Sequence, residues 1–124
     1  MLFETKSEVD IHEMSPLALA FVGDAVLELL VRARLVGTTR LQPNRLHTVA
    51  THYVSAHAQN LELDIIEPML TDAEAAVLRR GKNASKATVA KHATVQEYRA
   101  STGFECLLGW LYLNGQLDRV HELF

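Results

Sequence analysis

Residues 16–36, PLALAFVGDAVLELLVRARLV, are the stretch that most strongly indicates the fold. Its larger apolar residues recur at the three- and four-residue spacing of one helix face: Leu19, Val22, Val26, Leu29 and Leu30. Ser15 can cap the free N–H groups of a helix, and Pro16 suits the first helical position. Gly37 is a natural stop. We therefore expect a strongly buried helix over residues 16–36.

Gly23 and Asp24 lie in the middle of this expected helix, where neither residue type is favourable. A glycine inside a helix costs about 1 kcal/mol relative to alanine, so Gly23 suggests that another part of the chain approaches the backbone closely there. Aspartate is a poor helix former and is rarely buried without a partner. Glu105 is a second acid in an apolar setting, between Phe104 and Cys106.

Two carboxylates on two core helices have two explanations. An isolated buried carboxylate is costly unless it is paired, hydrogen-bonded or bound to metal, so Asp24 and Glu105 could face each other and hold a hard cation such as Mg²⁺. Alternatively, each acid is half-exposed or paired with a nearby arginine or lysine, and the spacing alone favours neither explanation. Glu28 could support a metal through water, but a salt bridge with Arg32 one turn later needs no special context and is preferred.

The rest of the chain also has helical patterns, and no alternation long enough to build a sheet. Capping boxes begin at Thr71 and Thr94, and Gly81 is expected to close the helix that starts at the first of them. The further helices are expected at residues 43–60, 71–81, 94–114 and 117–124. A polar loop is expected over residues 82–93 and a loose lead-in over residues 1–14. We therefore predict one all-α domain over residues 1–124.

Composition limits the classes of function. The apolar fraction of 48% suffices for a packed core, and the net charge of −3 means that any nucleic-acid binding must come from a local patch. The one cysteine, Cys106, cannot form an intramolecular disulfide and has apolar or anionic neighbours, so we expect a core residue in a reducing compartment. The first residues lack the pattern of a signal peptide, and no apolar run could span a bilayer. We expect a soluble cytoplasmic protein with no membrane partner.

One short segment is strongly basic. Six of the twelve lysines and arginines lie between residues 79 and 99, where Glu97 is the only acid. They are Arg79, Arg80, Lys82, Lys86, Lys91 and Arg99. Such asymmetry suggests contacts with phosphates, and Asn83 adds hydrogen-bonding groups. Taken alone, a solvated loop whose lysines keep the protein soluble is the better explanation. If the segment does bind nucleic acid, its lack of aromatic residues favours a duplex over a single strand.

Two stretches together resemble a known family. Residues 19–29, LAFVGDAVLEL, resemble the signature helix of the ribonuclease III domain, and residues 104–113, FECLLGWLYL, resemble its second catalytic helix. The closest likeness is to the Mini-ribonuclease III subfamily, which has no double-stranded-RNA-binding domain. Further motifs of that subfamily are Gln42-Pro43-Asn44, Leu46-His47, Tyr53-Val54-Ser55-Ala56 with Gln59, Arg80-Gly81-Lys82-Asn83-Ala84, and Tyr98-Arg99. Each motif alone is weak, but in this order they cover nearly the whole chain.

The resemblance implies a ribonuclease III catalytic domain in which Asp24 and Glu105 are catalytic and bind Mg²⁺, with Mn²⁺ as a possible substitute. Longer relatives have two further acids near the metal, but Ala20 and Thr102 stand at those positions here. The expected centre is therefore a pair of acids rather than four. Phe21 matches an aromatic residue that plugs a socket on the partner subunit, which implies a homodimer.

The expected function is endonucleolytic hydrolysis of double-stranded RNA that leaves 5′-phosphate and 3′-hydroxyl ends. Subfamily likeness suggests the large-subunit (23S) ribosomal RNA precursor as the substrate. The residues expected to contact RNA are Arg80, Lys82, Asn83, Lys86 and Lys91, with Asn44 and His47 as weaker candidates. One alternative is a catalytically inactive ribonuclease III fold that binds RNA or the ribosome. Another is a helical dimerisation protein unrelated to RNA.

Overall fold

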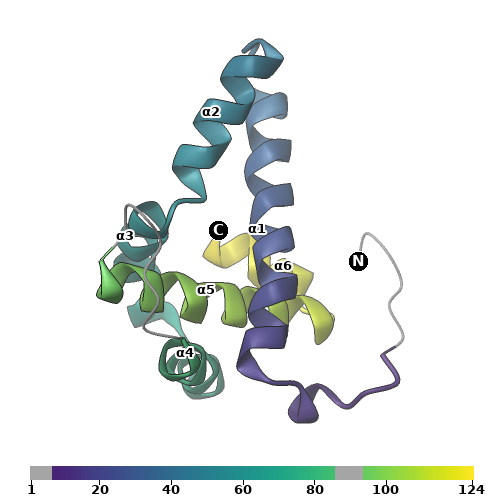
Figure 1. The fold of residues 1–124 in the computed structure, drawn as a ribbon. Coiled ribbons are helices and arrows are strands. Elements are labelled where there is room, and N and C mark those ends of the chain that lie inside the picture. Colours follow the sequence, from purple (N-terminus) through teal and green to yellow (C-terminus); the bar gives the residue numbers. More distant parts are fainter. Residues whose placement is uncertain (1–6, 86–93) are drawn as a thin grey trace.

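The fold is all-helical, as predicted, in a computed structural model that describes residues 7–85 and 94–124 (Figure 1). The α-helices are α1 (Pro16–Thr38), α2 (Pro43–Tyr53), α3 (Ala56–Ile66), α4 (Asp72–Ala84), α5 (Val95–Leu113) and α6 (Leu117–Leu123). Short 3₁₀ turns lie at Ile11–Glu13 and Glu67–Met69. Within the described ranges, no helix is both long and apolar enough to cross a membrane.

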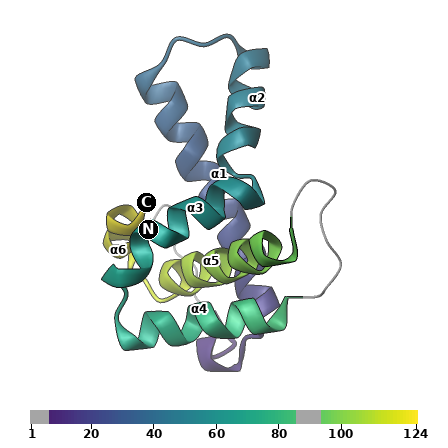
Figure 2. The ribbon, with the colours of Figure 1, turned by 90° about the vertical axis from the view of Figure 1, so that its left-hand side faces the viewer.

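Helix α5 forms the centre of the core. It lies between α3 and α4 and packs across α1 (Figure 2). Phe104, Leu107, Leu108 and Leu111 on this helix are each at most 1% exposed. Burying a side chain of this size contributes about 1.5–3 kcal/mol, so α5 supplies a large part of the hydrophobic stabilisation and fixes the positions of the helices around it.

The crossing of α1 and α5 is a contact between two backbones. A Cβ atom at Gly23 would overlap the carbonyl oxygen of Glu105 and lie 2.9 Å from the amide nitrogen of Gly109. A Cβ atom at Gly109 would overlap the carbonyl oxygen of Leu19. The expected close approach to the backbone at Gly23 is therefore confirmed. Only glycines at these two positions allow the helices to come this close.

Two predicted helix ends are wrong, and both lie at glycines. Helix α1 continues through Gly37 to Thr38, because nothing near Gly37 interrupts it. Helix α4 continues through Gly81 to Ala84, because Gly81 serves packing rather than termination. A Cβ atom at Gly81 would lie 2.7 Å from Cβ of Cys106 on α5, so α4 also needs a glycine where it meets α5.

The helix predicted over residues 43–60 is also wrong, because the chain breaks into α2 and α3. Val54 leaves the helical conformation, with φ −93° and ψ 2°. The side chain of Ser55 then accepts a hydrogen bond from the amide of Ala58 at 3.1 Å and caps α3. Two short helices at an angle therefore replace one continuous helix.

The lead-in predicted over residues 1–14 is not loose throughout. Asp10 caps a 3₁₀ turn through the amide of His12 at 3.0 Å, and Ile11 and Met14 pack against the core. Both predicted capping boxes are confirmed, at Thr71 and at Thr94.

A buried ion pair joins α4 to α6 and has no signal in the sequence pattern. The guanidinium of Arg119 donates to both carboxylate oxygens of Glu74, at 2.8 and 2.9 Å. Glu74 is only 4% exposed and also accepts a hydrogen bond from the amide of Thr71. The hydrogen bonds from Arg119 are the main reason why the pKa of Glu74 lies below its usual value. This pair positions the C-terminal helix against the core.

The backbone contact at Gly23 leads to a prediction about stability. Gly23→Ala should lower the free energy of unfolding by at least about 2–3 kcal/mol, because the added methyl group meets backbone atoms that cannot move aside. Gly37→Ala is the matched control on the same helix. It should be neutral or stabilising by up to about 1 kcal/mol, because alanine favours the helix and nothing lies within 4 Å. Urea unfolding followed by circular dichroism measures both, and equal stability of the two variants would contradict the close crossing.

Candidate active site

A shallow depression of about 430 Å³ lies where α1 crosses α5, beside the start of α3. Asp24 and Phe21 reach it from α1, Glu105 and Thr102 from α5, and Gln59 from α3. The structure therefore brings the two predicted catalytic acids together, although they are separated by 81 positions in the chain. The α1–α5 crossing is what places them at one site.

Asp24 is exposed, so of the two explanations left open by the sequence, a buried acid is excluded for this residue. The buried face of α1 runs through Gly23, Val26 and Leu27, whereas Leu29 is 51% exposed. Successive residues in a helix are rotated by about 100°, so Asp24 lies at the rim of the face that Gly23 buries. Its carboxylate remains accessible from solvent.

Glu105 is partly buried at the bottom of the same depression. The side chain of Gln59 donates a hydrogen bond from Nε2 to Oε2 of Glu105 at 3.1 Å. Burial raises the pKa of Glu105 to about 8, against the opposing effect of the Gln59 hydrogen bond and with further increases from Asp24 and Glu28. The site therefore disfavours a second negative charge unless a cation compensates for it.

The donor set fits a divalent cation that keeps much of its water. Among the described residues, no lysine, arginine or histidine forms a salt bridge with Asp24 or Glu105. That part of the chain also contains no group of three or more acidic, histidine or cysteine side chains placed to hold a metal. Mg²⁺ is typically held by one or two carboxylates and several waters, and Asp24 and Glu105 can supply that set.

The surroundings of the pair carry little further charge. Glu28 forms the predicted salt bridge, with Nε of Arg32 at 3.0 Å from its Oε2. Thr102 lies in the depression, with its hydroxyl oxygen 3.0 Å from the carbonyl oxygen of Tyr98. Ala20 also lines the depression. Neither Ala20 nor Thr102 adds an acid, so Asp24 and Glu105 are the only carboxylates that line this depression among the described residues.

The basic residues at the end of α4 mostly contact other parts of the protein. Nζ of Lys82 lies 3.1 Å from Oε1 of Glu67, and Arg99 donates to the side-chain oxygen of Asn83 and to the backbone carbonyl of Lys82, both at 3.1 Å. The bonds of Arg99 tie α4 to the N-terminal part of α5, and the Lys82–Glu67 pair ties α4 to the 3₁₀ turn that follows α3. Arg80 lies near His12, away from the depression. Lys86 and Lys91 lie outside the described residues.

Asn44 and His47 do not lie beside the acids. They are on the first turns of α2, at the end of a hairpin of α1 and α2 that projects away from α5 (Figure 1). His47 lines a separate crevice between these two helices, together with Arg32 and Val36.

Phe21 is 82% exposed at the rim of the depression, next to Leu17, which is 41% exposed. A largely exposed phenylalanine beside a second exposed apolar residue is unusual unless another surface covers it.

The sequence reasoning did not assign a role to Gln59, although the residue belonged to one of the quoted motifs. Gln59 is 3% exposed and contacts Glu105 directly. Periodicity could not reveal this contact, because it depends on the break between α2 and α3. Cys106 is 1% exposed and burial raises the pKa of its thiol to about 11, in agreement with a core role.

Comparisons with known proteins agree with this geometry. The family model described as "Ribonuclease III domain" matches residues 17–116. The chain is 46% identical over 116 residues to a protein of Enterococcus faecalis named "Mini-ribonuclease 3", with 92% of this chain and 88% of the relative covered. It is also 46% identical over 110 residues to a protein of that name from Symbiobacterium thermophilum, with coverages of 89% and 85%. A crystal structure of a Fusobacterium nucleatum protein has a TM-score of 0.83 and 28% identity, with coverages of 92% and 91%.

The burial of Glu105 predicts how stability depends on pH. Its pKa is about 8 in the folded protein and close to 4.5 when unfolded, so the folded state binds more protons between these values. Without divalent ions, the free energy of unfolding should therefore fall as pH rises from 5 to 8.5. In Glu105→Gln this part of the fall should be lost, because the amide does not ionise.

Urea unfolding in EDTA at several pH values measures this effect. Glu8→Gln is the control, because Glu8 is exposed and distant in sequence, and it should keep the pH dependence of the wild type. The same pH dependence in Glu105→Gln as in the wild type would show that Glu105 is not in the surroundings described.

Proposed function

The chain belongs to the ribonuclease III domain family and is an endoribonuclease for double-stranded RNA, and from that premise we propose that Asp24 and Glu105 together bind the Mg²⁺ ion needed for cleavage. Enzymes of this family depend on divalent metal ions. One observation carries the proposal: two carboxylates from different helices converge on one depression, and no basic side chain of the described residues neutralises them. Mn²⁺ has a similar preference for carboxylate and water ligands and should replace Mg²⁺.

The two acids have different surroundings and therefore different tasks. Glu105 is held from one side by Gln59 and supplies a fixed ligand. Asp24 lies at the exposed rim, where an RNA phosphate can approach the same ion. Asp24 and Glu105 would hold the divalent ion, which would supply stabilisation of the negative charge that develops on the phosphate and on the leaving 3′ oxygen.

The reaction is hydrolysis of a phosphodiester bond. A water molecule adds to the phosphorus, the bond from phosphorus to the 3′ oxygen breaks, and that oxygen takes up a proton. The products then carry 5′-phosphate and 3′-hydroxyl ends. The physiological substrate that we propose is the large-subunit (23S) ribosomal RNA precursor, on the basis of the likeness to Mini-ribonuclease III.

The basic residues at the end of α4 and those that follow them in the sequence are proposed to contact the phosphates of the RNA backbone. The ion pair of Lys82 with Glu67 is partly exposed, and such pairs contribute at most about 1 kcal/mol. A phosphate can therefore displace Glu67 from Lys82. Arg80 and Asn83, and Lys86 and Lys91 further along the chain, are also proposed to contact the RNA. Asn44 and His47 would contact a more distant part of a long duplex.

A homodimer is the second part of the proposal. Phe21 and Leu17 form an exposed apolar pair at the rim of the depression. If this rim is the dimer interface, two depressions lie on either side of it, and one duplex can extend across both.

The catalytic assignment is tested by neutralising each acid without changing its shape. Asp24→Asn and Glu105→Gln should each lower the rate of cleavage of a double-stranded RNA about a thousand-fold, because each removes a ligand from the metal. Asp118→Asn, at an exposed position on α6, should cleave like the wild type. The readout is the initial rate in Mg²⁺ and in Mn²⁺, resolved on a denaturing gel.

Cleavage at the wild-type rate by either site variant would show that the assignment is wrong. RNA that is bound but not cut by the wild type with either metal would instead indicate a binding module.

Phe21→Glu tests the interface. It should shift the protein from dimer to monomer in light scattering after size exclusion, because a charge would replace an apolar side chain that the partner covers. Ile65→Glu is the matched control, since Ile65 is 68% exposed on α3, away from the depression. A wild type that is monomeric at micromolar concentration would contradict the proposed dimer.

A further inference from the structure

Two side chains of the described residues form hydrogen bonds with the carboxyl group of Glu105. One is Asp24, and the other is Gln59, which donates its bond from an amide. It lies on α3, is 3% exposed, and its Nε2 lies 3.1 Å from Oε2 of Glu105 and 2.9 Å from the carbonyl oxygen of Val54. We propose that Gln59 is a positioning residue that holds the Glu105 carboxylate in the orientation needed to bind the metal. This inference rests on the proposed metal site at Asp24 and Glu105.

The orientation of the Gln59 amide is determined by its neighbours. Both groups near its nitrogen, the Val54 carbonyl and the Glu105 carboxylate, are acceptors. A reversed amide would place its oxygen against the carbonyl oxygen of Val54, which can only accept, so the nitrogen faces that carbonyl. Both N–H groups of the amide are therefore used, and one of them is given to Glu105.

The break between α2 and α3 makes this arrangement possible. In a continuous helix the carbonyl of Val54 would accept the amide of residue 58. Here the side chain of Ser55 accepts that amide, at 3.1 Å. The Val54 carbonyl, just before α3, is then available to accept a hydrogen bond from the side chain of Gln59, which lies in the first turn of α3. One N–H of the Gln59 amide thus donates to the backbone at Val54, and the other donates to Glu105 on α5.

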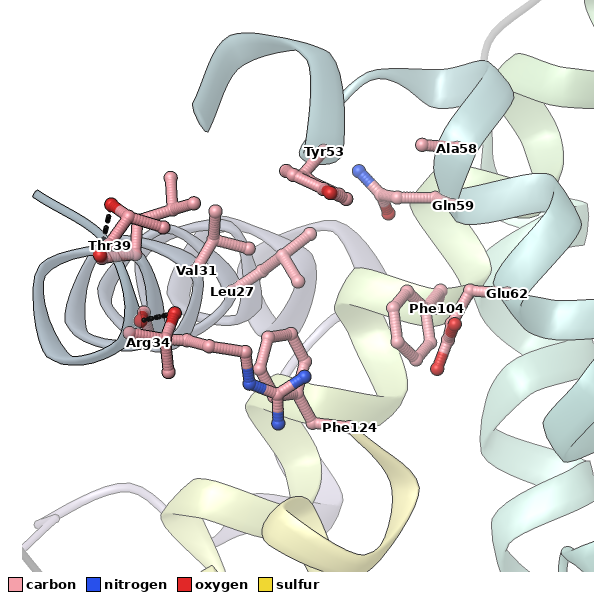
Figure 3. Close-up of a pocket in the computed structure, with 12 residues that line it drawn as sticks. Leu27, Val31, Arg34, Thr39, Tyr53, Ala58, Gln59, Glu62, Phe104 and Phe124 are labelled. Atoms are coloured by element: carbon pink, nitrogen blue, oxygen red, sulfur yellow. Dashed lines mark hydrogen bonds between the residues drawn. The ribbon is translucent and has the colours of Figure 1, made fainter. Parts of the chain in front are cut away.

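The remaining atom of the amide, Oε1, plays no part in holding the fold. Oε1 is buried, and no donor of the described residues lies within hydrogen-bond distance. Gln59 points from α3 into a cavity of about 370 Å³ whose walls are partly apolar, with Leu27 and Phe104, and partly charged, with Arg34 and Glu62 (Figure 3). An apolar side chain of similar size can pack against the apolar part of these walls. What the amide offers at this position is a pair of donors, and one of them serves Glu105.

A neutral donor suits a metal ligand better than a charged one. Lysine or arginine at this position would neutralise Glu105 and compete with the cation, whereas an amide orients the carboxylate and leaves its charge available. Gln59 donates to Oε2 of Glu105, and Asp24 lies close enough to interact with the same carboxyl group, so both acids can be reached by one cation. Side chains that orient metal ligands in this way commonly change metal affinity or activity 10- to 100-fold when they are replaced.

Gln59→Met is the decisive variant, because methionine keeps the length and volume of glutamine and removes both donors. In EDTA its melting temperature should stay within about 5 °C of the wild type, since an apolar side chain fits the cavity. The dissociation constant for Mn²⁺, measured by calorimetry on the protein without RNA, should rise about 10- to 100-fold. Gln96→Met, at an exposed position in the first turn of α5, is the control and should bind Mn²⁺ like the wild type.

Cleavage of double-stranded RNA supplies a second readout. The Mn²⁺ concentration for half-maximal rate should rise with the dissociation constant, while KM for the RNA should change less than two-fold. A role in packing alone predicts a lower melting temperature and an unchanged metal requirement, and that result would overturn the inference. Gln59→Leu repeats the comparison if the methionine variant does not fold, with the same expected loss of Mn²⁺ affinity.

The two possible failures can be told apart. If the wild type binds Mn²⁺ and Gln59→Met binds it equally well, only the role of Gln59 is wrong. If the wild type binds no Mn²⁺, or if Asp24→Asn binds it as tightly as the wild type, the metal site itself is wrong and this inference falls with it.

Discussion

The close contact between the backbones of α1 and α5 is the constraint on which the rest of the structure depends. Gly23 and Gly109 allow each helix to touch carbonyl oxygens of the other. Because Asp24 follows Gly23 directly, and because the carbonyl of Glu105 is what Gly23 touches, the same contact brings both acids to one depression. The helix crossing that organises the core therefore also assembles the candidate active site.

The two acids in the depression differ in their exposure to solvent, and this difference determines the electrostatics of the site. Asp24 is exposed to solvent, whereas Glu105 is partly buried, and burial raises the pKa of Glu105 to about 8. The only neutral side chain that donates to Glu105 among the described residues is Gln59. A divalent cation would remove the cost of holding two negative charges side by side, which is why the site suits a metal-dependent nuclease of the ribonuclease III family. The same reasoning explains why a neutral amide, rather than a basic side chain, lies behind Glu105.

Local signals predicted much of the fold. Ser15 and the capping boxes at Thr71 and Thr94 begin helices where they were expected, because a cap depends on side chains only three residues apart. The predictions that Gly37 and Gly81 end helices failed, since both lie inside helices, whereas the close approach predicted at Gly23 is confirmed. A glycine can end a helix or let two helices approach, and only the neighbouring helix distinguishes the two roles.

The sequence by itself determined the all-α class and the family resemblance and predicted which two acids form the candidate site, because these depend on residue types at fixed spacings along one chain. The tertiary structure decided which face of α1 is buried, so that Asp24 became a rim residue rather than a core residue. It also decided that the chain breaks after Val54, which brings Gln59 against Glu105 from 46 positions away. Contacts of this kind depend on the angle and separation of packed helices, and those quantities are set by the whole core rather than by any local pattern.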